Sequence, residues 1–520
     1  MTNLNEMKES EKINFFRSYF KKLWQTYMPV GLFFSAENNE FYYYDTGTNK
    51  ILNCEKSVYE FVNLILYKSY AEKNIDNYIF LKSKHEFIKN ATTVYHAIEE
   101  ENIMKTKPAL GFGASKHFFD YENMVKTSLT QLTLEVTERC NMRCTYCSFN
   151  TTIPRYKKKK LSNMTKETAF KAIDFFLNHS KNNENITITF YGGEPLLNFD
   201  LIKLCVEYVY KNTNQKCSFS LTTNGTLLDQ SIIHYLSKIE NFNVVVSLDG
   251  PKKIHNQYRK MKNGSNSYDQ VIMNLKALFH AFQHNKDRIS LSMVYTPFWS
   301  IQKLNQIVEL WDIHEWLPKD VKCHITYPSP GTIEEELWNT NFSIEDASLL
   351  NWAQQIYFDA YPHKETLGLI KSIVERPLTM ILQRTIYDIP VDKYSLNGCC
   401  LPALRKLFIN VDGKFHVCER IHEAPSIGNV ESGIDIDLVK KQYIDDYASL
   451  SISFCSNCWA LQLCNICYLQ RFQNGQLDPA NWNKDCNLTR SMILKHLKYY
   501  CRLLKKDSQG LNHLAFVKMR

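Results

Sequence analysis

Strand-like and helix-like patterns alternate from Gln131 to about Thr326, and this alternation constrains the fold more than any other feature of the chain. Short β-type runs predict six strands, at Leu132 to Val136, Ile186 to Phe190, Cys217 to Thr222, Val244 to Leu248, Ile289 to Tyr295 and Val321 to Ile325. Between them, apolar residues recur at helical spacing, as they do from Ala169 to Leu177. Strands that alternate with helices form parallel β/α units with a buried sheet. We therefore expect an α/β fold with a partial (β/α)6 barrel.

The chain of 520 residues contains 16 cysteines, and eleven of them fall into two groups, at positions 140 to 147 and 399 to 486. The N-terminus has no apolar segment typical of a secretory signal, and no apolar run approaches the roughly 18 residues of a membrane-spanning helix. We therefore expect a cytoplasmic protein without membrane association, in which thiols stay reduced and free to bind metals. The formal net charge of +8 is too small an excess to indicate a nucleic acid partner.

Cys140, Cys144 and Cys147 follow the first predicted strand, so three thiolates lie at the carboxyl end of a barrel strand, where barrel active sites gather. A zinc finger would need a fourth ligand nearby, and no histidine has a suitable spacing. Three thiolates can bind three irons of a cubane cluster and leave the fourth iron open to a small chelating ligand. On spacing alone, a zinc site or a chance grouping remains an alternative.

This loop, together with motifs at the next strand ends, resembles the radical SAM superfamily. Tyr191-Gly192-Gly193-Glu194-Pro195 is similar to the GGEP motif of that family, and the stretches 222–225 and 247–251 stand at corresponding positions. The resemblance implies that Cys140, Cys144 and Cys147 bind a 4Fe-4S cluster whose open iron chelates S-adenosylmethionine (SAM). Reductive cleavage of SAM would give a 5'-deoxyadenosyl radical that takes hydrogen from an unactivated carbon, so the cofactor performs the difficult step.

The same resemblance implies a SAM pocket. Its residues would be Tyr146 beside the adenine, Gly192, Gly193, Glu194 and Pro195 of the GGEP motif, Asn224, and the pair Ser247 and Arg259 around the methionine carboxylate. The glycines would bring backbone groups close to the ligand, and the acid would accept from its ammonium group. Arg259 lies twelve residues beyond Ser247, as in related enzymes. The alternatives are a surface arginine and a tyrosine in local packing.

The second group of cysteines resembles the SPASM domain that follows the barrel in many radical SAM enzymes. By that resemblance, Cys455, Cys458, Cys464 and Cys486 bind a distal auxiliary 4Fe-4S cluster, and Cys400, Cys418 and Cys467 bind a nearer one, with Cys399 as a candidate fourth ligand. Two features depart from the family pattern. Only Asn465 and Ile466 separate Cys464 from Cys467, where three residues are usual, and Cys399 and Cys400 are adjacent. Structural zinc is the alternative for this group.

We divide the chain into a hairpin and helix module (1–125), the barrel (126–330), a helical bridge (331–395) and the SPASM segment with a C-terminal helix (396–520). In the first, Phe41 to Tyr44 and Ile51 to Cys54 flank a polar turn and precede an amphipathic helix. This module resembles the leader-binding segment of ribosomal-peptide maturases, in which the edge of the hairpin would pair with an incoming leader strand. The alternative is a module that only caps the barrel.

SPASM-bearing radical enzymes act mostly on peptides or proteins. The resemblance therefore implies a precursor peptide, bound through its leader, as substrate, and an electron donor such as a flavodoxin or ferredoxin. We expect thioether crosslinks from cysteine sulfur to carbon, as in sactipeptide and bacteriocin maturation. The alternatives are carbon–carbon crosslinking, epimerisation, oxidation of a sulfatase cysteine, or a non-catalytic iron-sulfur or zinc scaffold. Glu419 stands where related sulfatase-maturing enzymes carry Asp, which disfavours sulfatase oxidation.

Overall fold

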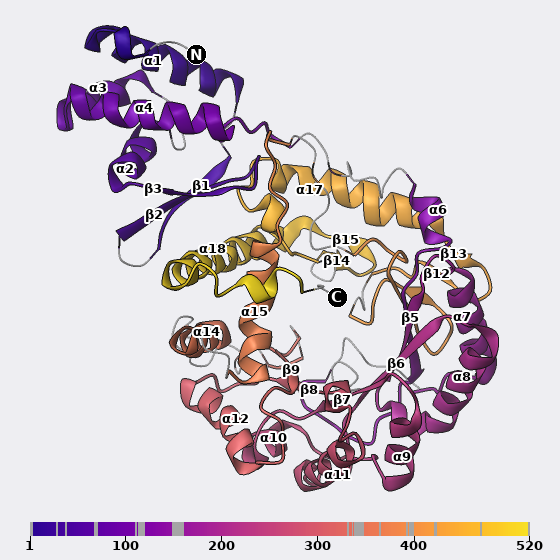
Figure 1. Ribbon diagram of the computed structural model, residues 1–520. Coiled ribbons are helices and arrows are strands. Elements are labelled where there is room, and N and C mark those ends of the chain that lie inside the picture. Colours follow the sequence, from indigo (N-terminus) through magenta and orange to yellow (C-terminus); the bar gives the residue numbers. More distant parts are fainter. Residues whose placement is uncertain are drawn as a thin grey trace.

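The structure is a computed structural model, and its described residues are all except 1–3, 28–29, 37–38, 67–70, 110–111, 113–119, 148–160, 330–331, 335, 337–347, 363–365, 392–393, 395–399, 421–423, 468–470 and 518–520. Figure 1 shows an arc of strands with helices along its outer side, an N-terminal module at one end of the molecule, and the C-terminal segments between the two. Within the described residues, no helix is long and apolar enough to cross a membrane.

The central sheet contains all six predicted strands. They are β4 (Gln131–Thr137), β5 (Asn185–Gly192), β6 (Lys216–Thr223), β7 (Phe242–Ser247), β8 (Ile289–Val294) and β9 (Lys322–Thr326). Each strand pairs in parallel with the next one along the chain, for example with Leu132 opposite Ile188 and Leu221 opposite Val244. The α/β fold with a parallel barrel-type sheet is therefore confirmed, and the carboxyl ends of all six strands point to the same rim.

Amphipathic helices connect these strands and cover the outer side of the arc (Figure 1). They are α7 (Lys166–Asn178), α8 (Phe199–Asn212), α9 (Gln230–Lys238), α10 (Lys252–Tyr258), α11 (Tyr268–Ala281) and α12 (Ile301–Ile313). Helix α7 begins after Thr165, whose side chain accepts a hydrogen bond from the Thr168 backbone N–H. Its buried residues, Ala169, Ala172, Ile173 and Phe176, recur at the predicted helical spacing. The apolar face of the helix thus packs against the sheet, and the ends of the strands remain available for functional residues.

The C-terminal part of the chain extends this sheet, which the sequence did not predict. β10 (Lys406–Ile409) pairs in parallel with β4, and β11 (Phe415–His416) pairs antiparallel with β10, so that the sheet has eight strands. A four-residue strand far from its partner in sequence carries little periodic signal. The segment from β10 to β11 therefore packs with the barrel, and our division of the chain at position 396 stays a proposal.

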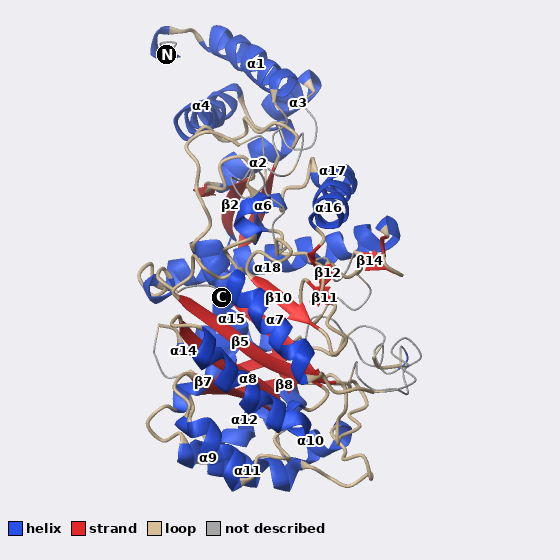
Figure 2. Ribbon diagram, turned by 90° about the vertical axis from the view of Figure 1, so that its right-hand side faces the viewer, coloured by secondary structure: helices blue, strands red, loops and turns tan. Residues whose placement is uncertain are grey.

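The N-terminal module has its own core. A three-stranded antiparallel sheet, β1 (Gly31–Ala36), β2 (Glu40–Asp45) and β3 (Ile51–Cys54), lies beside α1 (Glu9–Thr26), α2 (Lys56–Ile65), α3 (Glu72–Leu81) and α4 (Lys84–Glu101) (Figures 1 and 2). The predicted hairpin corresponds to β2 and β3, and β1 was missed. Phe16, Phe20, Phe61 and Phe87 are fully buried between the helices. The module therefore holds its shape by its own aromatic packing.

The turn between β2 and β3 fixes this module to the rest of the protein. Asp45, Thr46 and Asn49 are at most 3% exposed, although the turn is polar. Thr46 Oγ1 donates to the Trp459 carbonyl at 2.8 Å, and Arg384 Nε donates to the Asn49 carbonyl at 2.7 Å. The polar groups of this turn are buried and form hydrogen bonds with distant parts of the chain. The turn is therefore a buried joint between the module and the rest of the protein rather than a solvated loop.

Short elements and long helices complete the C-terminal half. They are α14 (Leu349–Ala360), α15 (Gly368–Leu382), α16 (Ile436–Leu438), α17 (Tyr447–Cys455), α18 (Trp482–Lys506) and the two-residue strands β12 to β15 (Gly428–Asn429, Gly433–Ile434, Phe472–Gln473 and Gln476–Leu477). Helix α18 packs against both β1 and α15. The described residues between α17 and α18, which include Cys458, Cys464 and Cys467, lie mostly in loops and turns.

Candidate active site and cysteine clusters

The loop that carries Cys140, Cys144 and Cys147 lies at the carboxyl end of β4, as predicted. It pairs with residues 258–262, which follow α10. Arg143 N–H donates to the Lys260 carbonyl at 2.8 Å, and Thr145 N–H donates to the Tyr258 carbonyl at 3.2 Å. This pairing brings Arg259 to the cysteine loop, although more than a hundred residues separate them in sequence. The rim of the barrel is thereby closed by two segments that carry predicted site residues.

Of the three cysteines of this loop, Cys144 is buried and Cys140 and Cys147 are half-buried. Burial raises the pKa of Cys140 to about 11 and that of Cys144 to about 12. A bound metal reverses this effect because it displaces the proton of a coordinating thiol. Within the described residues, no three metal-ligating side chains converge closely enough to hold a single ion. Three thiols and no histidine fit an iron-sulfur cluster, in which each thiolate binds a different iron.

Gly192 and Gly193 lie directly against the backbone at the start of the cysteine loop. Gly193 N–H donates to the Thr137 carbonyl at 2.8 Å, and Glu194 N–H donates to the Arg139 carbonyl at 2.9 Å. A Cβ atom on Gly192, whose φ is +134°, would come within 2.0 Å of the Thr137 oxygen. These glycines thus lie against the loop that carries the cysteines, and their predicted approach to a ligand stays a prediction.

Glu194 is fully buried and receives three hydrogen bonds from the protein. Its Oε1 accepts from Leu196 N at 3.1 Å and Thr223 Oγ1 at 2.8 Å, and its Oε2 accepts from Asn224 N at 2.7 Å. Burial raises the pKa of Glu194, and these hydrogen bonds oppose the rise. A carboxylate oxygen has two lone-pair positions, so one acceptor position remains on Oε2. Pro195 begins the helical turn Pro195–Asn198 that follows.

Asn224 lies between the GGEP motif and the cysteine loop. Its side-chain amide donates to Asn141 Oδ1 at 2.9 Å and lies 3.9 Å from the sulfur of Cys140. Its backbone N–H is held by Glu194. The motifs at the ends of β4, β5 and β6 are thus connected by hydrogen bonds into one site, which the strand order alone does not guarantee.

Arg259, Tyr146 and Asp249 form a buried polar group beside the cysteines. Arg259 is 7% exposed, and its Nη1 donates to the Tyr146 hydroxyl at 2.8 Å. Tyr146 donates in turn to Asp249 Oδ2 at 2.5 Å, and Arg259 Nη1 lies 3.8 Å from Asp249 Oδ1. Arg259 Nε is buried without a hydrogen-bond partner among the described residues. A buried guanidinium with an unpaired N–H fits an anionic ligand such as a carboxylate.

Two residues of this region have roles that the sequence did not reveal. Asp249 lies in the motif after β7 and Lys303 lies on α12, and no sequence pattern marks either residue as part of a site. Lys303 Nζ donates to the carbonyls of Thr296 and Pro297, and burial lowers its pKa to about 8. The only signal in the sequence is the position of Asp249, two residues beyond Ser247. Ser247 itself lies half-buried at the end of β7.

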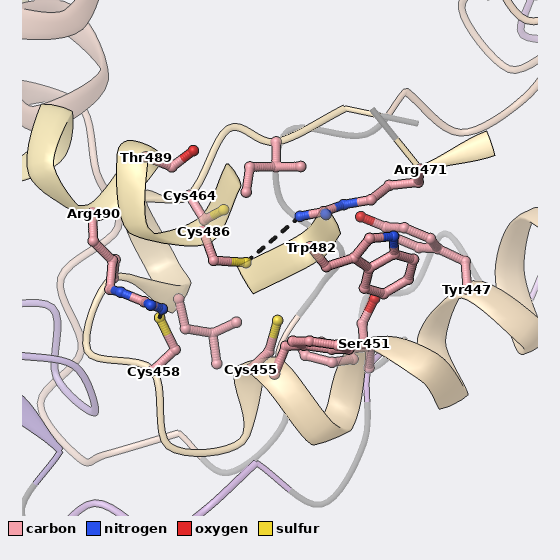
Figure 3. Close-up of a pocket in the computed structure, with 15 residues that line it drawn as sticks. Tyr447, Ser451, Cys455, Cys458, Cys464, Arg471, Trp482, Cys486, Thr489 and Arg490 are labelled. Carbon is pink, nitrogen blue, oxygen red and sulfur yellow. Dashed lines mark hydrogen bonds between the residues drawn. The ribbon is translucent and has the colours of Figure 1, made fainter. Parts of the chain in front are cut away.

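The four cysteines assigned to the distal auxiliary cluster line one pocket. Figure 3 shows Cys455, Cys458, Cys464 and Cys486 around it, together with Arg471, Arg490 and Trp482. Cys455 ends α17, Cys458 and Cys464 lie in the loop that follows it, and Cys486 lies near the start of α18. Their convergence from two segments gives a four-thiol donor set, which fits a cubane cluster.

The structure does not describe all of the cysteines assigned to the nearer cluster. Cys418 follows β11 and lies close enough to Cys467 for their charges to interact, and burial raises the pKa of Cys418 to about 11. Cys400 is exposed, and Cys399 lies outside the described residues. The ligand set of this cluster therefore stays a prediction.

Comparisons with known proteins agree with this arrangement. The model of the radical SAM superfamily matches residues 134–310. A cysteine-type anaerobic sulfatase-maturating enzyme of Clostridium perfringens is 35% identical over 381 residues, which cover 71% of this chain and 92% of that protein. The radical SAM cyclopropyl synthase TigE of Paramaledivibacter caminithermalis is 32% identical over 168 residues, or 30% of this chain and 34% of that protein.

The fold is also similar to that of a solved structure. Native anSMEcpe with bound AdoMet and Cp18Cys peptide matches with a TM-score of 0.51 at 21% identity, and the match covers 75% of this chain and 99% of that chain. At this level of identity the likeness concerns the fold alone. It extends well beyond residues 134–310 and therefore includes parts of the chain outside the barrel.

Proposed function

Because the chain belongs to the radical SAM superfamily of enzymes, within the group that modifies peptides and proteins, we propose that it matures a ribosomally made precursor peptide by forming thioether crosslinks. Cys140, Cys144 and Cys147 would hold the 4Fe-4S cluster, and Tyr146, the GGEP residues, Asn224, Ser247 and Arg259 would surround SAM. When bound, these cofactors supply a 5'-deoxyadenosyl radical that removes hydrogen from carbon. The observation that carries the proposal is the contact between the cysteine loop and the segment of the buried Arg259.

The residues of the chain would act by orientation and by exclusion of water. Arg259 Nε is the unpaired donor that a SAM carboxylate would satisfy, and Asp249 balances the charge of the guanidinium from the side of the protein. Glu194 positions Asn224 through its backbone N–H and keeps one acceptor position for an ammonium group. A radical needs such a closed site because solvent would otherwise quench it.

The peptide substrate is proposed from the relatives and from the N-terminal module. The solved structure of anSMEcpe contains a bound peptide, and the sulfatase-maturating enzyme is named for the maturation of a protein. In this chain β3 is an edge strand of the N-terminal sheet and is followed directly by α2. An extended leader would add to this edge by main-chain hydrogen bonds, as peptides do at other exposed sheet edges.

Two auxiliary clusters are part of the same proposal. Cys455, Cys458, Cys464 and Cys486 would hold the distal cluster, and Cys400, Cys418 and Cys467 would hold the nearer one, with Cys399 as its candidate fourth ligand. Carbon–sulfur bond formation removes a hydrogen atom, a proton and one further electron from the peptide. An auxiliary cluster supplies a site that can accept such an electron, and a flavodoxin or ferredoxin would reduce the SAM-binding cluster.

A second candidate function is oxidation of a cysteine in a protein substrate, and the similarity to the cysteine-type sulfatase-maturating enzyme favours it. The surroundings of Glu419 weigh against it. Lys406 Nζ lies 2.5 Å from Glu419 Oε2, and both side chains are 18% exposed. Burial acts to raise the pKa of Glu419, but the charge and hydrogen bond of Lys406 outweigh burial and lower it. A carboxylate held in this ion pair is a poor general base.

The test begins with anaerobic reconstitution of the full chain and analysis of iron, sulfide and zinc. We expect about twelve irons per chain, and a loss of about four in a Cys140/Cys144/Cys147→Ala variant, because each cubane holds four irons. The variant should form no 5'-deoxyadenosine from SAM, whereas Cys205→Ala, which removes a buried thiol of α8 outside all three groups, should retain both iron and SAM cleavage. Formation of 5'-deoxyadenosine by the triple variant would refute the radical assignment.

The product distinguishes the two candidate functions. With a cysteine-rich precursor peptide encoded near the gene as substrate, a thioether product keeps its sulfur and loses two hydrogens for each crosslink. Oxidation to formylglycine replaces the sulfur by oxygen. High-resolution mass spectrometry separates these outcomes, and sulfur loss would contradict the thioether proposal in favour of the second candidate.

A further inference from the structure

Two arginines point into the pocket that the four distal cysteines line, and the mechanism described above does not use them. Arg471 Nη2 donates to the sulfur of Cys486 at 3.6 Å, and Arg490 Nη1 donates to the sulfur of Cys458 at 3.7 Å (Figure 3). The remaining lining is mostly apolar, with Phe454, Leu461, Ile466 and Trp482 among its members. Two cations therefore face four thiols in a site with little water.

Arg471 is the more deeply buried of the two. Its side chain is 4% exposed, and the Nε and Nη1 atoms are buried without a hydrogen-bond partner among the described residues. Asp485 Oδ2 lies 3.6 Å from Nη1, beyond hydrogen-bond distance. The guanidinium stacks over the Trp482 ring, 4.5 Å from its centre. The ring holds the guanidinium in place, and the N–H groups at Nε and Nη1 stay available for an anion in the pocket.

An iron-sulfur cluster bound here would be that anion, because four thiolates outweigh the positive charge of the cubane core. Reduction adds a further negative charge, so a nearby cation stabilises the reduced cluster more than the oxidised one. Hydrogen bonds to the sulfurs act in the same direction.

From these contacts we propose that Arg471, with Arg490 as a weaker partner, is a positioning residue that raises the reduction potential of the distal auxiliary cluster by donating to the sulfurs of Cys486 and Cys458. The cluster would thereby become a better acceptor for the electron released during carbon–sulfur bond formation. This inference rests on the proposed function, because it requires that the four cysteines hold a cluster.

The experiment measures a midpoint potential rather than activity. The Cys140/Cys144/Cys147→Ala background removes the SAM-binding cluster, so that electron paramagnetic resonance during a redox titration reports only the auxiliary clusters. In this background Arg471→Gln should lower the potential of one auxiliary cluster so that its reduced-to-oxidised ratio falls about tenfold, or ~59 mV for one electron. Arg490→Gln, which removes the partly exposed cation, should cause a smaller shift in the same signal. Arg471→Lys keeps the charge and should lie between wild type and Arg471→Gln.

Lys498→Gln is the matched control, because it removes an exposed positive charge from the same helix as Cys486. Its potential should equal that of the parent. An unchanged potential in Arg471→Gln and Arg490→Gln, with iron content intact, would overturn the inference. If Arg471→Gln loses iron, Arg490→Gln and Arg471→Lys decide the question. A Cys455/Cys486→Ala variant that loses no iron would instead refute the distal cluster itself, so that failure of the proposed function is distinguished from failure of this inference.

Discussion

The Tyr146 hydroxyl donates to Asp249 Oδ2 at 2.5 Å and accepts from Arg259 Nη1 at 2.8 Å. One tyrosine thus joins the cysteine loop after β4 to the residues that follow β7. All three side chains are at most 8% exposed, so the charges of Asp249 and Arg259 balance each other away from water. Tyr146 lies between Cys144 and Cys147, so these contacts connect the cysteine loop directly to Asp249 and Arg259.

Replacement of Asp249 should be more harmful than replacement of Tyr146. Asp249→Asn leaves the buried Arg259 guanidinium without its carboxylate, which costs about 3 kcal/mol of unfolding free energy or more. Tyr146→Phe removes hydrogen bonds but leaves the charges paired, at a cost of about 1–2 kcal/mol. Denaturant titration of the apo protein measures both. Asp269→Asn, which breaks an exposed pair with Lys252, should stay within about 0.5 kcal/mol of wild type. Equal losses in the two buried variants would contradict the proposed charge balance.

Gly192 and Gly264 provide a matched pair for the close approach at the cysteine loop. Both have positive φ, +134° and +84°, but a Cβ on Gly264 would meet no atom within 4 Å. Gly264→Ala should therefore cost only the backbone strain, about 1–2 kcal/mol. Gly192→Ala adds a collision with the Thr137 carbonyl and should also displace the loop that carries the cysteines. We expect a larger loss of stability and a loss of about four irons after reconstitution in Gly192→Ala alone. Full iron content in Gly192→Ala would refute this role.

His496 on α18 should make the protein sensitive to mild acid. Burial lowers the pKa of its ring to about 4. The unfolded chain takes up this proton near the ordinary pKa of about 6.5, so the folded state loses stability as the pH falls from 6.5 through 4. Between pH 7 and pH 5 the loss amounts to about 2 kcal/mol. His496→Gln should remove that part of the pH dependence, whereas the exposed His284→Gln should retain it. Parallel pH profiles for wild type and His496→Gln would show the assignment to be wrong.

The buried turn of residues 45–49 should determine how firmly the N-terminal module is attached. Thr46→Val keeps the shape of the side chain but leaves the Trp459 carbonyl without its donor, at a cost of about 1–2 kcal/mol. Because the module has its own aromatic core, we expect faster release of an intact N-terminal fragment in limited proteolysis. Thr93→Val, which removes an exposed helical hydroxyl from the same module, should be cleaved at the wild-type rate. Equal cleavage of both variants would contradict a joint at Thr46.

The parts of the fold that depend on local sequence patterns could be predicted from the sequence. All six barrel strands, the helix after Thr165 and the β2–β3 hairpin follow from periodicity, because burial of one face or one sheet fixes which positions are apolar. The placement of Cys140, Cys144 and Cys147 at a strand end follows in the same way, since the carboxyl ends of parallel strands share one rim. The spacing of the cysteines and of Ser247 and Arg259 also indicated the family.

Contacts between distant segments could only be learned from the tertiary structure. β10 joins β4 across more than 260 residues, and neither strand carries a mark of its partner. The polar turn at Thr46 reads as solvated but is buried, because Trp459 and Arg384 satisfy its hydrogen bonds. Asp249, Arg471 and Arg490 have no periodic signal, since a charged residue near a site differs from a surface residue only by what surrounds it. Local sequence determines the strands and the thiols, whereas the dielectric environment and charge pairing around them arise only when the chain has folded.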